Sequence, residues 1–224
     1  MKAVLFDMDG VLVDVSLSYR LTIKKVVERL GSYEISFSQI QEYKNKGGFN
    51  NDWDLTRAIL WDRGKRVSRE EVVEIFQEIY LGKNFDGLIR NEKWLLDSKY
   101  LEKLKRKYPL GMVTGRPQRE VSYVLKRFDK QNYFSAVVAM EDFPPHKSKP
   151  HPWGIRKALE ILDSESCWYL GDTRDDMEAA WRAGVVPIGV VSCGPESEEL
   201  EGVLRRYGAA RILKNINNIE EVLE

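Results

Sequence analysis

Short apolar runs alternate with amphipathic stretches along most of the chain. Five runs have the length and composition of strands buried on both faces of a parallel sheet, at residues 2–6, 110–113, 136–140, 167–170 and 186–191. After the first of them, apolar side chains recur at helical spacing at residues 98–108, 117–128, 152–162 and 175–183. Strands that alternate with helices in this way predict a doubly wound parallel α/β sheet.

Residues 15–89 break this alternation, because helical patterns follow one another there without a convincing strand. Three patterns cover residues 17–30, 37–44 and 52–61, and a fourth opens with the capping box Ser68-x-x-Glu71. We therefore predict an all-helical cap, residues 15–89, inserted into a core made of residues 1–14 and 90–224.

The composition argues against several classes of partner. The 224 residues include 35 basic and 35 acidic side chains, so the net charge of zero favours neither nucleic acid nor an anionic membrane. No apolar run approaches the ~20 residues that span a bilayer, and residues 2–6 are typical of a strand instead of a signal peptide. Cys167 and Cys193 lack the spacing of a disulfide or metal site, so we expect buried or surface thiols and a cytoplasmic protein.

Two carboxylates follow the first predicted strand, in the segment Asp7-Met8-Asp9-Gly10. Residues i and i+2 of a strand point to the same side, so Asp7 and Asp9 can address one centre. That centre lies at the carboxyl end of the strand, where open α/β sheets bind ligands. Repulsion between the two carboxylates requires a cation or a shared proton. Taken alone, the segment is equally typical of a strand that ends in a polar turn.

Polar groups of complementary chemistry follow three more of the predicted strands. They are Thr114-Gly115-Arg116, Lys149 just before a predicted helix, and Gly171-Asp172-Thr173-Arg174-Asp175-Asp176. Separately, they have simpler explanations as a helix cap, a solvated loop charge and acidic residues favoured by a helix dipole. Together, at strand ends that share one sheet edge, they predict carboxylates for a hard cation beside a hydroxyl and an ammonium for a phosphate.

These segments, with the lysine segment written as Lys149-Pro150-His151-Pro152, resemble the four motifs of the haloacid dehalogenase-like hydrolase superfamily in the same order. The insertion after the first motif resembles the helical C1 cap of subfamily I, the phosphoglycolate-phosphatase-like branch. The resemblance covers essentially the whole chain. Residues 47–53 and the segment Thr114-Gly115-Arg116-Pro117 look like a little-studied subgroup of that branch, some of whose members carry histidine-biosynthesis-like names.

The resemblance implies a magnesium-dependent phosphatase that hydrolyses a small phosphorylated metabolite. Asp7 is then the nucleophile that forms an aspartyl-phosphate, and Asp9 is the acid/base that protonates the leaving group and activates water. Mg²⁺ is implied to bind Asp7, the backbone carbonyl of Asp9 and Asp172. Asp176, in preference to Asp175, is implied to bind a metal-ligated water or to orient the lysine.

The same resemblance implies contacts for the phosphoryl oxygens. Lys149 and Thr114 are expected to hold them in the transition state, where the negative charge lies. We also expect Gly115 and Arg116 to bind the substrate at this place. A surface charge explains Arg116 equally well.

The loop at residues 47–53 is the candidate for contacts to the leaving group. Its two amide side chains, Asn50 and Asn51, suit hydrogen bonds to substrate hydroxyls. A simpler interpretation is an inter-helix turn in which Asp52 caps the next helix and Trp53 packs inside the cap.

The residues leave three further functions open. A phosphomutase differs mainly in how well the cap excludes water, and a phosphonate-cleaving enzyme would use a cap lysine such as Lys44 or Lys46. A degenerate, non-catalytic binding module is the third. Halide displacement needs no acid/base carboxylate and no metal, so Asp9 and Asp172 weigh against it. We expect no nucleic acid or membrane partner, and a monomer or a weak homodimer.

Overall fold

The computed structural model describes residues 1–49, 51–191 and 197–223. The chain divides into two compact units, one made of Met1–Val13 with Trp94–Glu224 and the other of Asp14–Lys93. It passes between them at β2 (Val13–Asp14) and β3 (Lys93–Trp94), two short strands that pair with each other. Each unit is described below by itself.

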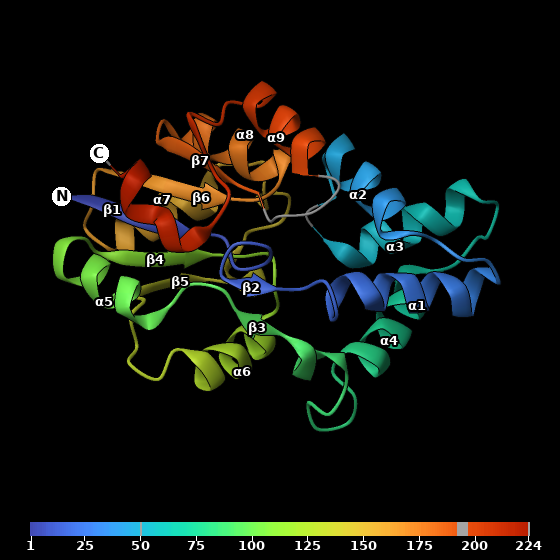
Figure 1. The fold of residues 1–224 in the computed structure, drawn as a ribbon. Coiled ribbons are helices and arrows are strands. Elements are labelled where there is room, and N and C mark those ends of the chain that lie inside the picture. The colour runs from blue at the N-terminus through green and yellow to red at the C-terminus, as the bar shows by residue number, and fades with distance from the viewer. Residues whose placement is uncertain (50, 192–196, 224) are drawn as a thin grey trace. The chain divides into compact units, whose positions relative to one another are not determined.

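The first unit is built on a six-stranded sheet in the order β5-β4-β1-β6-β7-β8, and every neighbouring pair in it is parallel. Its strands are β1 (Lys2–Phe6), β4 (Leu110–Val113), β5 (Ala136–Val138), β6 (Ser166–Gly171), β7 (Val186–Val190) and β8 (Arg211–Leu213). The arrows of β4 and β6 point the same way in Figure 1. The predicted parallel α/β fold is therefore confirmed, and the central β1 brings its carboxyl end between those of β4 and β6.

Helices connect these strands, with η3 following the last of them, and local signals explain the limits of α8. They are α5 (Ser98–Lys107), α6 (Gln118–Phe128), η2 (Met140–Asp142), α7 (Trp153–Ile161), α8 (Arg174–Ala183), α9 (Ser197–Arg206) and η3 (Ile216–Val222). Thr173 closes a reciprocal capping box at the start of α8, and Gly184 ends that helix with a left-handed φ of 77°. The sequence patterns did not predict α9, β8 or η3.

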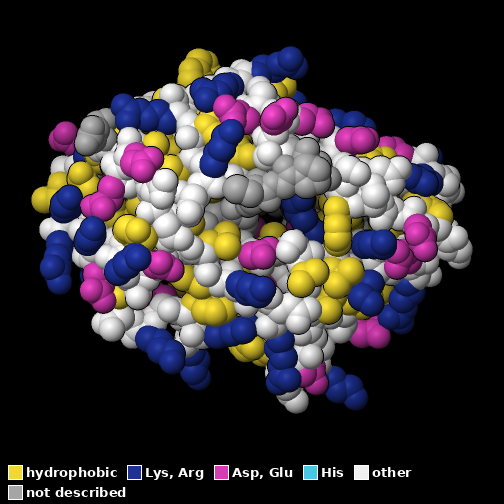
Figure 2. Space-filling view, viewed as in Figure 1, with side chains coloured by type: hydrophobic (Ala, Val, Ile, Leu, Met, Phe, Trp, Pro, Cys, Tyr) yellow, Lys and Arg dark blue, Asp and Glu magenta, His cyan; other side chains and the backbone are white. Residues whose placement is uncertain are grey.

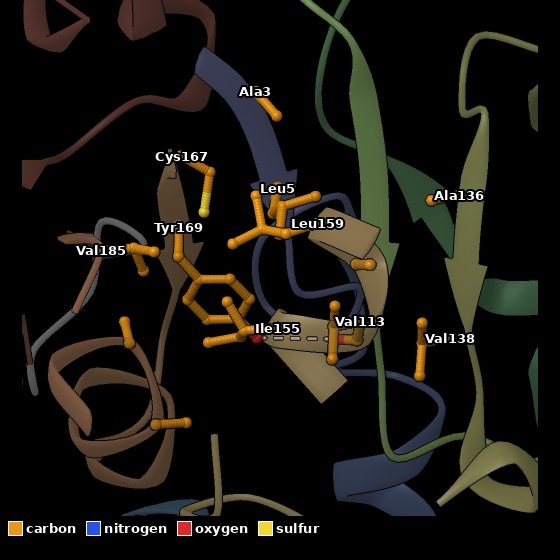
Figure 3. Packing of buried hydrophobic residues seen from close by; sticks show 13 residues of the cluster. Ala3, Leu5, Val113, Ala136, Val138, Ile155, Leu159, Cys167, Tyr169 and Val185 are labelled. Carbon is orange, nitrogen blue, oxygen red and sulfur yellow. Dashed lines mark hydrogen bonds between the residues drawn. The ribbon is translucent and has the colours of Figure 1, made fainter. Parts of the chain in front are cut away.

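A hydrophobic cluster fills the space between the sheet and helices α7 and α8 (Figure 3). Small and branched side chains dominate it, as expected where helices pack closely on a parallel sheet. Cys167 is fully buried here, so of the two expected kinds of thiol, buried or surface, it is the buried kind. Cys193 lies outside the described residues. Tyr169 is the one tyrosine of the cluster, and its ring points from β6 toward Val113 (Figure 3). Its hydroxyl therefore needs polar partners inside the unit.

The second unit is helical in its described part, apart from its residues in β2 and β3. It contains α1 (Tyr19–Gly31), α2 (Phe37–Lys46), α3 (Asp52–Asp62), α4 (Arg69–Tyr80) and η1 (Leu88–Asn91). Ser36 forms a capping box with Gln39, and the Ser68 hydroxyl accepts from the backbone N–H of Glu71. Tyr19 packs its ring 4.3 Å from that of Tyr80, between α1 and α4. Packing of apolar helix faces therefore holds this unit together.

The surface carries both signs of charge. On the face shown in Figure 2, lysine and arginine side chains are interspersed with aspartate and glutamate. This agrees with the balanced composition. Among the described helices, none is both long and apolar enough to cross a bilayer.

Candidate active site

Asp7 lies at the carboxyl end of β1, and the backbone around it is fixed from two sides. Its N–H donates to the carbonyl of Leu170 at the end of β6, at 2.8 Å. The chain then turns back on itself, since the N–H groups of Leu12 and Val13 both donate to the Met8 carbonyl at 2.9 Å. The turn therefore positions Asp7 and the following residues beside the end of β6.

Gly10 explains how close this turn comes to the fourth motif. Its φ is +73°, and a Cβ added to it would lie 1.9 Å from Oδ2 of Asp172. No side chain fits there, so only glycine permits both the backbone conformation and the approach of the carboxylate. The close approach of the Asp172 side chain to Gly10 places its carboxylate beside the residues that follow β1.

Lys149 joins the first and fourth motifs. Its Nζ donates to Oδ1 of Asp7 and to Oδ1 of Asp176, each at 2.7 Å, and its residue exposure is only 4%. It also lies 3.5 Å from the Val113 carbonyl, at the end of β4. The explanation of Lys149 as a solvated loop charge is therefore wrong, because the side chain is buried and satisfied by two carboxylates.

Asp176 has a role that the helix dipole alone does not explain. Its Oδ1 accepts from Lys149 and from the Tyr169 hydroxyl, the latter at 3.0 Å. Its Oδ2 accepts from the backbone N–H and the hydroxyl of Thr173, at 3.1 and 2.6 Å. A carboxylate has about four lone-pair positions, and these four bonds use them. Asp176 therefore orients Lys149, and its carboxylate has little capacity left to bind a metal directly.

Tyr169 is a polar member of the site that sequence reasoning missed. Its hydroxyl lies 3.2 Å from Lys149 Nζ and 3.4 Å from the Val113 carbonyl, the bond drawn in Figure 3. Together with Asp176 these contacts enclose the phenol completely. The available signal was a tyrosine within a strand buried on both faces, because a buried phenol requires a hydrogen-bond partner.

Burial and neighbouring charges together shift the pKa values of Lys149 and Asp7. Burial disfavours the charged form of Lys149, but the carboxylates of Asp176 and Asp7 outweigh it and hold the lysine pKa well above its ordinary value. Burial raises the pKa of Asp7 well above its usual range; Lys149 opposes that shift, and Asp176, Asp9 and Asp172 add to it. Lys149 is thus the cation that lowers the pKa of Asp7, against burial and three neighbouring carboxylates.

The residues present fit a hard divalent cation. Asp7, Asp172 and Asp176 each offer a carboxylate oxygen, and the three atoms lie within 4.8 Å of one another. Oxygen donors of this kind suit Mg²⁺, and such a cation would offset part of the repulsion among these carboxylates. Each oxygen of Asp176 already accepts two hydrogen bonds, which disfavours Asp176 as a direct ligand.

Arg116 contacts the second carboxylate of the first motif. Its Nε donates to Oδ1 of Asp9 at 2.7 Å, and its Nη2 contacts the same oxygen. Arg116 is 2% exposed, which excludes a surface charge. Thr114 is also buried; its hydroxyl accepts from the Arg116 backbone N–H at 3.2 Å, and it does not cap α6, where Pro117 takes that position. Gly115, between them, is partly exposed.

The loop at residues 47–53 is described in part, because Asn50 lies outside the described residues. Asn51, and not Asp52, is the N-cap of α3, since its Oδ1 accepts from the backbone N–H groups of Trp53 and Asp54 at 2.9 and 3.3 Å. The expected Asp52 cap is therefore wrong. Asp52 instead begins the helix and forms a 2.9 Å ion pair with Lys44. The side-chain oxygen of Asn51 therefore already accepts hydrogen bonds from the N-terminus of α3.

Comparisons with known proteins show which sequences this chain is similar to. A family model described as haloacid dehalogenase-like hydrolase matches residues 4–190. A phosphoglycolate phosphatase from Aquifex aeolicus is 30% identical over 187 residues, which cover 82% of each chain. A protein from Phytophthora nicotianae named imidazoleglycerol-phosphate dehydratase is 36% identical over 200 residues. That match covers 85% of this chain but 43% of the relative, so the chain spans less than half of that relative's length.

A solved structure supports the same fold assignment. The crystal structure of a putative beta-phosphoglucomutase from Thermotoga maritima superimposes with a TM-score of 0.69 and 26% identity, and the match covers all of both chains. The six-stranded parallel sheet and its flanking helices thus recur in a protein of similar sequence.

Proposed function

The chain belongs to the haloacid dehalogenase-like hydrolase family, in its phosphoglycolate-phosphatase-like branch, and we propose that it is a magnesium-dependent phosphatase acting through an aspartyl-phosphate on Asp7. The observation that carries this proposal is the buried Lys149, whose ammonium joins Asp7 and Asp176 beside Asp172. A fixed cation at a carboxylate nucleophile suits a reaction in which two anions must meet.

The first half-reaction transfers the phosphoryl group to Asp7. A carboxylate oxygen of Asp7 attacks phosphorus in line, its bond to phosphorus forms, and the bond from phosphorus to the leaving oxygen breaks. Phosphate monoesters hydrolyse so slowly in water that enzymes supply up to ~10²¹-fold acceleration. The Lys149 ammonium and the Thr114 hydroxyl both lie near the end of β4, where they can bind the phosphoryl oxygens. Mg²⁺ held by Asp7, Asp172 and the Asp9 carbonyl would shield the charge and align the two reactants.

Asp9 moves the protons in both half-reactions. It gives a proton to the leaving oxygen as the first bond breaks. The ionised Asp9 then takes a proton from the water that attacks phosphorus of the aspartyl-phosphate, which releases inorganic phosphate and restores the Asp7 carboxylate. General acid/base catalysis of this kind contributes typically ~10²–10⁴-fold.

A small phosphorylated metabolite is the proposed substrate class. The printed names of the relatives, phosphoglycolate phosphatase, imidazoleglycerol-phosphate dehydratase and beta-phosphoglucomutase, all contain such compounds. Phosphoglycolate is the first substrate to test, because the match to the Aquifex aeolicus enzyme covers most of both chains. No dehydratase activity is proposed, since the chain matches less than half of that relative.

Phosphomutase chemistry is the second candidate, and the 26% identity to the Thermotoga maritima structure favours it over phosphonate cleavage and over a non-catalytic binding module. Of the two candidate lysines for phosphonate cleavage, Lys44 is paired with Asp52, and a salt-bridged ammonium is a poor nucleophile. The ammonium of Lys46 lies 4.3 Å from the centroid of the Tyr43 ring. A cytoplasmic setting, a monomer or weak homodimer, and the assignment of residues 15–89 as a cap that excludes water stay predictions.

The proposal is tested by phosphate release from p-nitrophenyl phosphate and phosphoglycolate, with Mg²⁺ and with EDTA. We expect release that EDTA abolishes and Mg²⁺ restores, and no turnover by Asp7→Asn although its circular dichroism matches the wild type. Adding beta-glucose 1-phosphate identifies a mutase, which would convert the substrate without net phosphate release. Absence of all these activities with any divalent metal would contradict the proposal and favour a binding module.

A further inference from the structure

Arg116 is among the largest fully buried side chains of the described chain, and its guanidinium is directed at the proposed acid/base. Nε and Nη2 both contact the same oxygen, Oδ1 of Asp9, and the Nε contact is 2.7 Å. The side chains are unequally exposed, 1% for Arg116 and 28% for Asp9. The arginine is therefore the fixed partner of the pair, and the carboxylate is the one that reaches toward solvent and substrate.

Both backbone groups of Arg116, its N–H and its carbonyl, form hydrogen bonds. Its N–H donates to the Thr114 hydroxyl at 3.2 Å, and its carbonyl accepts from the N–H of Met140 at 2.9 Å. These bonds connect it to the end of β4 and to the start of η2, which follows β5. The backbone that carries the guanidinium is therefore a rigid part of the sheet edge.

Asp9, in contrast, lies on a short turn and has to serve two different oxygen atoms, that of the leaving group and that of water. A carboxylate free to rotate would present either oxygen in many orientations, and misplacement by ~1 Å costs as much as 10²-fold in rate. Two N–H donors of one planar guanidinium hold Oδ1 in place and so restrict this rotation. Oδ2 carries neither of these bonds and is the oxygen left for proton transfer.

We propose that Arg116 is a positioning residue that acts through Asp9, by fixing which carboxylate oxygen exchanges protons with the leaving group and with water. This inference rests on the proposed phosphatase function. It differs from a phosphate clamp in a measurable way. A clamp binds the phosphate whichever leaving group is attached, whereas a residue that acts through Asp9 affects the reaction most when the leaving group needs a proton.

The test compares Arg116→Met, Asp9→Asn and the double variant on two substrates. p-Nitrophenyl phosphate has a leaving group that departs readily as an anion, and phenyl phosphate has one that benefits from protonation. We expect Arg116→Met to lower kcat about 10-fold on phenyl phosphate, a part of the ~10²–10⁴-fold of acid/base catalysis, and clearly less on p-nitrophenyl phosphate, with KM nearly unchanged. The double variant should be no slower than Asp9→Asn.

Two further variants separate positioning from general damage. Arg116→Lys keeps the charge but not the fork, so it should recover part of the kcat lost on phenyl phosphate. Arg205→Met is the matched control, because Arg205 pairs with Glu201 at 2.9 Å on α9 of the same unit and 56% of its side chain is exposed. It should match the wild type on both substrates. If Arg116→Met does not fold by circular dichroism, Arg116→Lys and its double variant with Asp9→Asn supply the same comparison.

The outcomes distinguish the two proposals. A wild type that hydrolyses neither substrate contradicts the phosphatase function itself. An active wild type in which the losses of Arg116→Met and Asp9→Asn multiply contradicts the action of Arg116 through Asp9. The inference is also overturned if the loss is equal on both substrates, or if it lies in KM alone, which would identify a phosphate clamp.

Discussion

Removing a single oxygen atom from Tyr169 tests whether its phenol stabilises the lysine cluster. The variant Tyr169→Phe keeps the ring among the apolar side chains around it (Figure 3) and deletes the hydroxyl that contacts Asp176 at 3.0 Å and Lys149 at 3.2 Å. Lys149 keeps its bonds to two carboxylates, and Asp176 keeps those to Thr173. The loss is thus limited to the phenol's own bonds.

The magnitude follows from the charge on those partners. A hydrogen bond to a charged group contributes ~1.5–3 kcal/mol, and no solvent reaches the Tyr169 side chain to replace it. We expect the free energy of unfolding to fall by about that amount. For a protein of this size this corresponds to a Tm lower by about 3–12 °C, at ~2–4 °C per kcal/mol.

Thermal and urea denaturation measure this change, and Tyr108→Phe is the control. Tyr108 belongs to the same unit, and its ring packs 5.4 Å from that of Trp168. Its substitution should change stability by no more than ~0.5 kcal/mol. Equal Tm values for Tyr169→Phe and the wild type would show that the phenol stabilises nothing, and the hydrogen-bond argument would be refuted.

The pH dependence supplies a second check with a definite sign. Burial, and then the Asp176 carboxylate, raise the pKa of Tyr169 well above its ordinary value of 10.0. A group whose pKa is higher in the folded state contributes stability that is present below the unfolded pKa and lost above it. The stability difference between wild type and Tyr169→Phe should therefore be constant below about pH 9 and shrink as the pH rises past 10.

The remaining predictions concern the lysine, a glycine and a thiol. Lys149→Met leaves two buried carboxylates without their ammonium, so we expect no turnover and a loss of ~3–5 kcal/mol in urea denaturation; a stable, active variant would contradict the site. Gly10→Ala places a Cβ at the Asp172 carboxylate and should raise the Mg²⁺ concentration needed for half-maximal activity, whereas unchanged titration would separate that turn from the metal. Burial raises the pKa of Cys167 to about 12, so in a Cys193→Ser background iodoacetamide at pH 8 should modify this thiol only after urea unfolding. Alkylation of the folded protein would contradict the burial of Cys167. The stability contributed by the neutral Cys167 thiol should fall as the pH rises from about 9 toward 12.

Much of the fold was predictable because its signals are local. The limits of β1 and β4 agree with the predicted runs, since strands buried on both faces are continuous apolar segments. The helices before and after β4, α5 and α6, follow from the helical spacing of their apolar side chains. The three-residue β8 escaped prediction because it lies at the sheet edge and begins with an exposed arginine, and therefore has no apolar run to identify it.

The sequence by itself determined which groups gather at one edge of the sheet. A parallel sheet brings the carboxyl ends of its strands together whatever the details of packing, so Asp7, Lys149 and Asp172 were identifiable as neighbours from order and strand position alone. The chemistry of a carboxylate nucleophile with its cations followed from the residue types.

Only the tertiary structure decided which atoms pair. Lys149 and Asp7 are 142 positions apart, and Arg116 and Asp9 are 107 apart, so no local spacing relates them. Tyr169 has the pattern of a core residue, and its place beside the lysine depends on the packing of β6 against its neighbours. Hydrogen bonds require distances within a few tenths of an ångström, and strand order fixes positions only to within a residue or more. The choice between a phosphate clamp and an acid/base partner for Arg116 therefore arises from side-chain geometry.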